Sequence, residues 1–172
     1  MQEHFSKVAE AMLRMDLGEI EGARNIFKEV RESGNMVWLV GNGGSAATAG
    51  HFANDLTKMA GVRAIAVHSM ISSALAYGND NGWERMYADL LVSLMKPGDA
   101  LVAISCSGKS SNVLEAVKLF HHNRLIIMTG NKYDSPLAGV DADSKIFVVD
   151  SDIRVQEDAH LAICHAIAGS LR

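Results

Sequence analysis

Residues 36–45 read Met36-Val37-Trp38-Leu39-Val40-Gly41-Asn42-Gly43-Gly44-Ser45, and an Ala-rich segment follows. A short apolar run before a glycine-rich turn and a helical segment predicts strand, turn and helix. Glycines let the backbone approach a ligand closely, and the first turn of a helix presents free N–H groups to an anion. The stretch therefore predicts either an anion-binding βα unit or an ordinary strand-to-helix turn.

The alternation of apolar runs and helical patterns continues along the chain. Short, mostly apolar runs occur at 36–40, 63–67, 100–104, 125–128 and 145–149. Helical patterns are expected at 45–58, 70–77, 81–95, 110–122 and 154–171. Strands that alternate with helices predict an α/β fold, a three-layer αβα sandwich around a five-stranded, doubly wound parallel sheet.

Two more helices are expected before the first strand, over residues 2–15 and 19–32, because apolar residues recur there at helical spacing. The length of 172 residues predicts a single domain, with N-terminal helices in 1–33 and the doubly wound core in 34–172. The first helix could cover this domain or dock on a partner subunit.

Composition narrows the classes of function. Hydrophobic residues make up 48% and charged residues 21%, as in ordinary globular proteins. The net charge of −4 does not favour a nucleic-acid partner. No apolar run reaches the ~20 residues of a membrane helix. The first residues lack the layout of a signal peptide, and two cysteines do not suggest a disulfide framework, so the cytoplasm is the expected compartment.

Ligands of an open parallel sheet bind outside the carboxyl ends of the strands. Three polar clusters are expected there, at 41–45, 78–80 and 105–112. The last is the most informative, because its four serines surround a glycine directly before a helix, an arrangement that suits a phosphate ester. The alternative is a Ser-rich turn with a helix cap. Cys106, in this cluster, could be a nucleophile, but a small residue that fills a tight turn is the simpler interpretation.

A second group of side chains suits a metal ion. His51 and Asp55 are one helical turn apart and share a face. Glu157 and His165 share a face of the last helix, to within about 80°. Two imidazoles and two carboxylates suit Zn²⁺ or a related divalent ion. The alternative for the last helix is an acidic first turn that complements the helix dipole, with His165 half-buried in the core.

Taken in order, four motifs resemble the sugar isomerase (SIS) domain family. They are Gly41-Asn-Gly-Gly-Ser45 with His51, Gly78-Asn79-Asp80, Ser105-x-Ser-Gly-x-Ser110, and Glu-Asp-x-His…His in the last helix. The resemblance covers nearly the whole chain and is closest to the heptose-phosphate branch. It implies a flavodoxin-like sheet, a homotetramer with active sites between subunits, and conversion of sedoheptulose 7-phosphate to D-glycero-D-manno-heptose 7-phosphate.

The resemblance also implies roles for particular residues. Phosphate contacts would fall on Ser105, Ser107 and Ser110 with the backbone of Cys106. Other substrate contacts would fall on Asn42, Gly43, Gly44, Ser45, Asn79, Asp80 and Glu157. The zinc ligands would be His51, Asp55, Glu157 and His165.

The isomerisation moves a proton between C1 and C2 through an enediol, which requires an acid and a base. Asp55 is the expected base, and His165 would act on the sugar oxygens. The family usually has Glu at the position of Asp55 and Gln at that of Glu157, so Glu157 is an alternative base and another phosphosugar an alternative substrate. A further alternative is a non-catalytic SIS protein that binds a sugar phosphate or a regulatory or replication-initiation protein.

Overall fold

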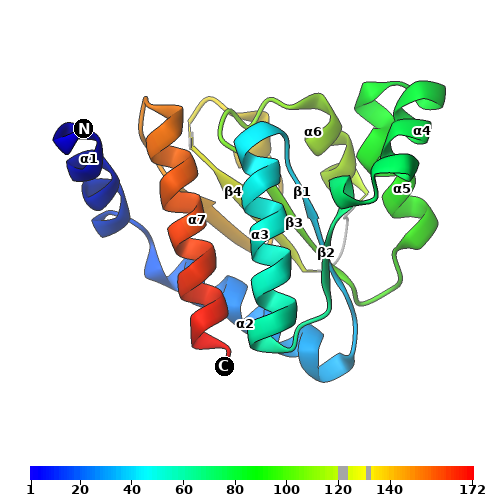
Figure 1. The fold of residues 1–172 in the computed structure, drawn as a ribbon, viewed down its shortest axis with the longest axis horizontal. Helices are drawn as coiled ribbons and strands as arrows, with labels where there is room; N and C mark the ends of the chain where they lie inside the picture. Colours follow the sequence, from blue (N-terminus) through cyan, green and yellow to red (C-terminus); the bar gives the residue numbers. More distant parts are fainter. Residues whose placement is uncertain (120–123, 131–132) are drawn as a thin grey trace.

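The computed structural model describes residues 1–119, 124–130 and 133–172. A five-stranded parallel sheet lies at its centre, with strand order β2-β1-β3-β4-β5 (Figure 1). The strands are β1 (Val37–Val40), β2 (Ala64–Ala66), β3 (Ala100–Ser105), β4 (Leu125–Thr129) and β5 (Ser144–Phe147). All five lie within two residues of the predicted apolar runs, and the predicted α/β fold is confirmed.

Helices cover both faces of the sheet (Figure 1). One face carries α2 (Leu17–Ser33), α3 (Gly43–Ala60) and α7 (Ile153–Ser170), with α1 (Gln2–Leu13) beside α7. The other face carries α4 (Ile71–Asn81), α5 (Met86–Leu94) and α6 (Ser111–Lys118). Three short 3₁₀ turns complete the described elements, at Val67–Ser69, Trp83–Arg85 and Pro136–Gly139.

Side chains of the central strands alternate between two apolar cores. In β1, Val37 and Leu39 join the core under α2, α3 and α7, whereas Trp38 and Val40 join the core under α4, α5 and α6. Strand β3 alternates in the same way and is buried along its whole length. Burial on both faces explains why these strands read as continuous apolar runs.

The strand order predicts a ligand crevice at the carboxyl ends of β1 and β3. The chain leaves β1 through α3 to reach β2 on one side, and β3 lies on the other side of β1. Such a reversal opens a gap between the two loops that follow these strands, and open α/β sheets bind their ligands there. The glycine turn at 41–45 and the serine loop at 105–111 are these two loops.

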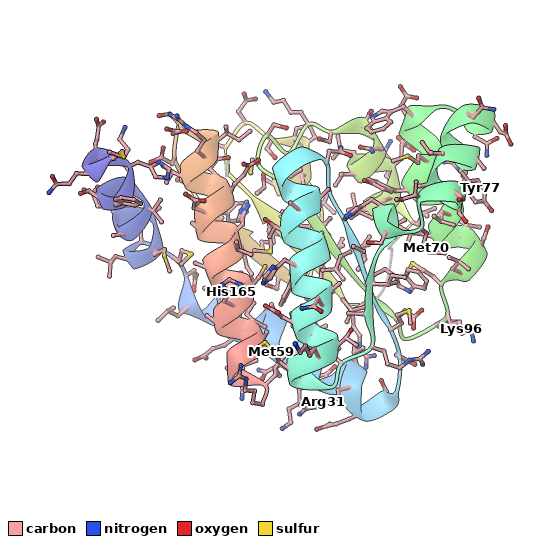
Figure 2. All side chains as sticks on the ribbon, viewed as in Figure 1. Arg31, Met59, Met70, Tyr77, Lys96 and His165 are labelled. Atoms are coloured by element: carbon pink, nitrogen blue, oxygen red, sulfur yellow. The ribbon has the colours of Figure 1, made fainter. Side chains whose placement is uncertain are left out.

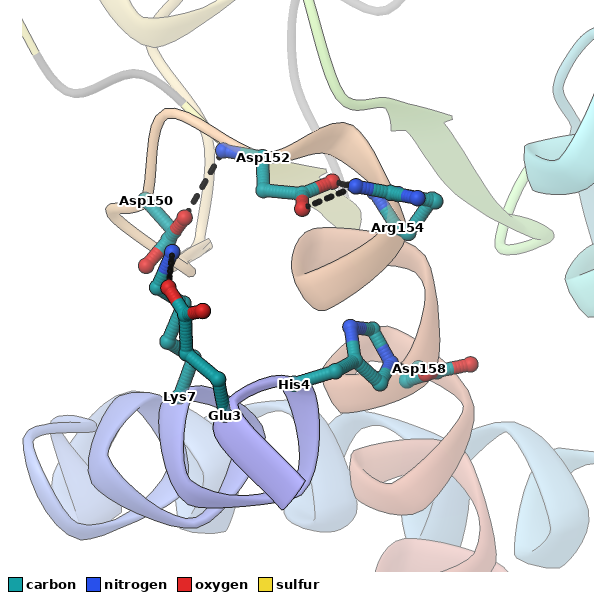
Figure 3. A network of polar contacts seen from close by, with 7 residues as sticks. All are labelled: Glu3, His4, Lys7, Asp150, Asp152, Arg154 and Asp158. Atoms are coloured by element: carbon teal, nitrogen blue, oxygen red, sulfur yellow. Dashed lines mark hydrogen bonds and ion pairs between the residues drawn. The ribbon is translucent and has the colours of Figure 1, made fainter. Parts of the chain in front are cut away.

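Helix α1 is attached to the first turns of α7. The His4 ring donates to the Asp158 carboxylate at 2.7 Å, beside the Glu3–Lys7 and Asp152–Arg154 ion pairs (Figure 3). Ala11, the buried residue of α1, also joins the core under α7. The first helix therefore covers the domain, which is one of the two alternatives from the sequence; docking of this helix on a partner subunit stays a prediction.

One predicted helix is wrong. The pattern at 81–95 predicted one continuous helix, but α4 runs to Asn81, a 3₁₀ turn follows, and α5 begins only at Met86. Gly82 causes the break, since its φ of +90° lies outside the helical region. The helix predicted over 110–122 is observed as Ser111–Lys118, and residues 120–122 lie outside the described part of the chain.

The predicted division of the chain at residue 33 coincides with the end of α2 at Ser33, while the single-domain organisation stays a prediction. Among the described helices, none is long and apolar enough to cross a membrane.

A buried carboxylate joins the start of β1 to the turn before β3. Asp99 is only 6% exposed, and its side chain accepts the backbone N–H groups of Met36 and Lys96 and the indole N–H of Trp38, each at 2.9 Å. The contact with the Trp38 indole is buried, so that donor would otherwise lack an acceptor. Asp99 therefore holds the amino ends of the two strands that form the crevice.

We expect Asp99→Ala to lower the free energy of unfolding by about 3 kcal/mol, because three donors lose their acceptor. Urea denaturation measures this change. The matched control is Asp141→Ala at an exposed aspartate, expected to stay within about 0.5 kcal/mol of the wild type. Equal unfolding midpoints for the two variants would contradict the structural role of Asp99.

Candidate active site

The glycine turn forms the first wall of the crevice. Asn42 precedes α3 as its N-cap residue, and Gly43 has a φ of +53°. A side chain at Gly41 could not fit, since a Cβ there would lie 2.8 Å from the backbone of Ser45. The predicted strand, turn and helix are confirmed, with α3 beginning two residues earlier than expected.

A pair of asparagines ties the glycine turn to the serine loop. The amide of Asn42 donates to Asn112 at 2.8 Å, and that of Asn112 donates back at 3.0 Å. The hydroxyl of Tyr87 donates to the Gly41 carbonyl at 2.6 Å. Burial raises the pKa of Tyr87 to about 12, so the phenol stays neutral and remains a donor. The two loops are thus held at a set separation.

The sequence did not identify Tyr87 or Asn112 as site residues. Tyr87 lies far along the chain, in α5, and no local pattern marks it. Asn112 does stand at the start of α6, directly after the serines, and its fully buried side chain also accepts the N–H of Val113. The signal for Asn112 in the sequence was an amide side chain at the start of a predicted helix.

The serine loop forms the opposite wall. The Ser105 hydroxyl donates to that of Ser110 at 3.3 Å and accepts the Gly108 N–H at 3.1 Å. Ser110 is the N-cap residue of α6 but makes no side-chain cap bond. Ser107 is exposed, and Lys109 pairs with Asp134 at 3.0 Å. Hydroxyls and helix-start N–H groups are therefore gathered at one point, as phosphate binding requires.

Helix α7 approaches the glycine turn more closely than a side chain would allow. A Cβ at Gly44 would lie between 2.2 and 2.5 Å from the carboxylate group of Glu157. Likewise, a Cβ at Gly130, after β4, would lie 1.9 Å from the Gln156 amide. Two glycines thus allow consecutive side chains of α7 to reach the loops at the sheet edge.

Three side chains of types that bind metals converge farther along α3 and α7. The Nε2 atoms of His51 and His165 are 3.0 Å apart, and they lie 3.3 Å and 3.7 Å from Oδ2 of Asp55. Figure 2 labels His165 on α7. Asp55 is 6% exposed, whereas both histidines are exposed. A tetrahedral zinc site with bonds of about 2.1 Å has ligand atoms about 3.4 Å apart, so the three donors fit such an ion.

Glu157 is not in this group. The ligand atoms that lie within 4.8 Å of one another belong to His51, Asp55 and His165 among the described residues. Glu157 lies two helical turns earlier on α7, with its carboxylate against Gly44. Glu157 and His165 share a face of α7, as helical spacing predicted, but their different positions along the helix axis separate them.

Asn79 and Asp80 lie in the last turn of α4 rather than in a loop. Their exposed side chains bond to each other at 2.8 Å. Within the described residues, no hydrogen bond joins them to either wall of the crevice. Their predicted contact with substrate stays a prediction.

A buried cluster lies behind the serine loop. The Sγ atom of Cys106 is 3.8 Å from the Ser45 hydroxyl and 3.7 Å from Nδ1 of His160. Burial raises the pKa of Cys106 to about 11 and lowers that of His160 to about 4. At neutral pH both side chains are uncharged, which does not support Cys106 as a nucleophile.

The profile of the SIS domain family matches residues 2–128 of this chain. The chain belongs to the SIS domain family. A phosphoheptose isomerase of Aliarcobacter butzleri is 40% identical over 123 residues, covering 69% of this SIS protein and 63% of that relative. A probable phosphoheptose isomerase of Thermoplasma acidophilum is 33% identical, covering 99% and 96%.

A solved structure of phosphoheptose isomerase from Neisseria gonorrhoeae has the same fold. It superposes with a TM-score of 0.88 at 29% identity, over 99% of this chain and 94% of that one. The likeness extends over the N-terminal helices and α7, which lies beyond the residues that the family profile matches.

We expect Gly44→Ala to lower the free energy of unfolding by about 1–3 kcal/mol, because the new methyl group overlaps the Glu157 carboxylate. In a Glu157→Ala background the new methyl group has space, and Gly44→Ala is expected to lower the free energy of unfolding by less than about 0.5 kcal/mol. Chemical denaturation of the four proteins measures the coupling. Equal costs in both backgrounds would show that Glu157 does not lie against Gly44.

Stability is expected to fall in acid because of His160. Its folded-state pKa of about 4 lies below the ordinary value of 6.5, so between these values the unfolded chain binds a proton that the folded chain excludes. Full stability is present above pH 6.5, and about 3 kcal/mol is lost as the pH falls towards 4. We expect His160→Asn to show a shallower decline in urea denaturation over this range; parallel declines would be contrary to a buried neutral imidazole.

Proposed function

We propose that this SIS protein is a phosphosugar aldose–ketose isomerase that converts sedoheptulose 7-phosphate to D-glycero-D-manno-heptose 7-phosphate. The convergence of His51, Asp55 and His165 beside a crevice with a phosphate-type loop carries the proposal. Relatives that match nearly the whole chain are named for phosphoheptose isomerisation, which supports this substrate over other ketose phosphates.

The phosphate-type crevice and the metal group lie at different positions along the axis of α3. Gly44, at the crevice, and His51, in the triad, are seven residues apart, which is about 10 Å of helix. This separation suits an extended sugar whose phosphate lies at one end and whose reacting carbons lie at the other. We assign the phosphate to Ser105, Ser107, Ser110 and the Cys106 backbone, and the sugar chain to the glycine turn and Glu157.

Substrate contacts are also proposed for three groups outside the phosphate loop. They are the Asn42 side chain, the Ser45 hydroxyl, and the Asn79 and Asp80 side chains of α4. The first two belong to the wall of the crevice. The α4 residues are exposed and have capacity for further hydrogen bonds, which suits contact with a sugar.

His51, Asp55 and His165 would hold a divalent metal ion, and zinc is the ion that two imidazoles and one carboxylate suit best. When bound, such an ion polarises a carbonyl oxygen and stabilises negative charge on it. Three protein ligands leave a coordination position open for substrate. Glu157 would become a fourth ligand only if its side chain left Gly44.

Asp55 is the proposed base. Its Oδ1 atom accepts a hydrogen bond from the Asn54 amide at 3.3 Å, and its Oδ2 atom faces the two histidines. The carboxylate would remove the proton from C1 of the ketose and return it to C2 through an enediol. His165 would move the proton between the sugar oxygens. Glu157, close to the sugar end of the crevice, is the alternative base.

We also propose a homotetramer in the cytoplasm, with active sites between subunits. The exposed His51 and His165 side chains leave the metal group open on one side, and a neighbouring subunit could cover it. Exposed apolar side chains on α1, including Phe5 and Leu13, suit the same kind of contact.

We expect Asp55→Asn to reduce turnover of sedoheptulose 7-phosphate by about 10²–10⁴-fold, because the amide cannot accept the proton. Proton NMR in D₂O follows both aldose formation and deuterium incorporation at the carbon. Inorganic phosphate should still bind, since Asp55 is eleven residues from Gly44, which is about 16 Å of helix. Asp141→Asn, at an exposed site, is the matched control.

An active Asp55→Asn enzyme, combined with an inactive Glu157→Gln enzyme, would transfer the role of base to Glu157. A panel of ketose phosphates, tested with and without Zn²⁺, decides the substrate. Turnover of none of them by the wild-type protein would contradict the isomerase proposal and favour the non-catalytic alternative.

A further inference from the structure

Cys106 connects three parts of the site. It stands in the serine loop after β3, and its Sγ atom contacts Ser45 at the start of α3 and His160 in α7. All three side chains are at most 6% exposed. A thiol in this position therefore does more than fill space in a turn, because it touches polar atoms of two other elements.

The protonation states decide the direction of the contact. A neutral imidazole carries one proton, and Nε2 of His160 is buried without a hydrogen-bond partner among the described residues. A neutral ring with its proton on Nε2 leaves Nδ1 free to accept the Cys106 S–H. The thiol is then the donor and the imidazole the acceptor.

Helix α7 contacts each part of the candidate site through a different residue. Glu157 lies against the glycine turn, His160 against the serine loop, and His165 against Asp55. These three residues lie on one helix, so their spacing along its axis is fixed. Of the three contacts, the one at His160 is the most deeply buried.

We propose that His160 is a positioning residue: its contact with Cys106 sets the serine loop relative to α7, and so sets the phosphate of the substrate relative to Asp55 and His165. This inference rests on the proposed function. Loss of the contact would loosen the phosphate end of the site and leave the acid–base residues in place. The effect is therefore expected in the KM value, with little change in kcat.

Two pairs of variants test this role. Cys106→Ala and His160→Leu remove the donor and the acceptor, and each is expected to raise KM by about tenfold with kcat within about threefold. Cys106→Ser keeps a donor, and His160→Asn keeps a polar atom near the position of Nδ1, so both should lie closer to the wild type. A fall in kcat at unchanged KM in the first pair would overturn the proposal.

Binding of inorganic phosphate supplies a readout that does not need turnover. We expect Cys106→Ala and His160→Leu to weaken phosphate binding about tenfold, measured by calorimetry. Cys164→Ala is the matched control. It removes the other buried cysteine, which lies in α7, and should lower stability while phosphate affinity stays within about twofold. If the wild type binds phosphate but isomerises no sugar, the proposed function fails, and phosphate binding by the variants still tests the positioning role. Unchanged phosphate affinity in both variants would overturn the positioning role of His160.

Nitrogen NMR of the histidine rings tests the contact itself. The wild type is expected to show His160 as a neutral ring with a proton on Nε2, and Cys106→Ala should shift the Nδ1 signal. Identical Nδ1 signals in the two proteins would show that the thiol does not donate to this ring, and would overturn the inference.

Discussion

The candidate site depends on the close approach of α7 to the edge of the sheet. A Cβ at Gly44 would lie 2.2 Å from a Glu157 oxygen, and one at Gly130 would lie 1.9 Å from a Gln156 oxygen. Because both positions lack a side chain, α7 can lie beside α3 along its length (Figure 1). That arrangement brings His165 within 3.7 Å of Asp55 and His160 within 3.7 Å of Cys106.

The sheet order and the buried polar contacts complement this approach. The strand order reverses between β1 and β3, where a ligand crevice is expected, and Asp99 joins the amino ends of these strands. Asn42 and Asn112 then join the loops at the carboxyl ends. Each contact satisfies groups that would be costly to bury alone, so the walls of the crevice are preorganised for a ligand.

Much of the fold could be predicted because its signals are local. Strands buried on both faces must be apolar throughout, and all five appear as such runs. The wrong helix prediction at residues 81–95 has an equally local cause, the positive φ of Gly82. Glycine also occurs inside helices, so its presence alone does not predict a helix break. Tyr87 could not be found in this way, and neither could the contact of His160 with Cys106, since the partners Gly41 and Cys106 are distant in sequence.

The amino-acid sequence by itself determined the α/β class, the strand positions, the serine loop and the pairing of His51 with Asp55. Helical geometry alone places residues four apart on one face, so that pairing requires no tertiary information. Only the tertiary structure decided that His165 completes the group and that Glu157 lies instead against Gly44. Their positions depend on where α7 lies along the axis of α3. Packing between the helices sets this relative position, and periodicity within one helix does not.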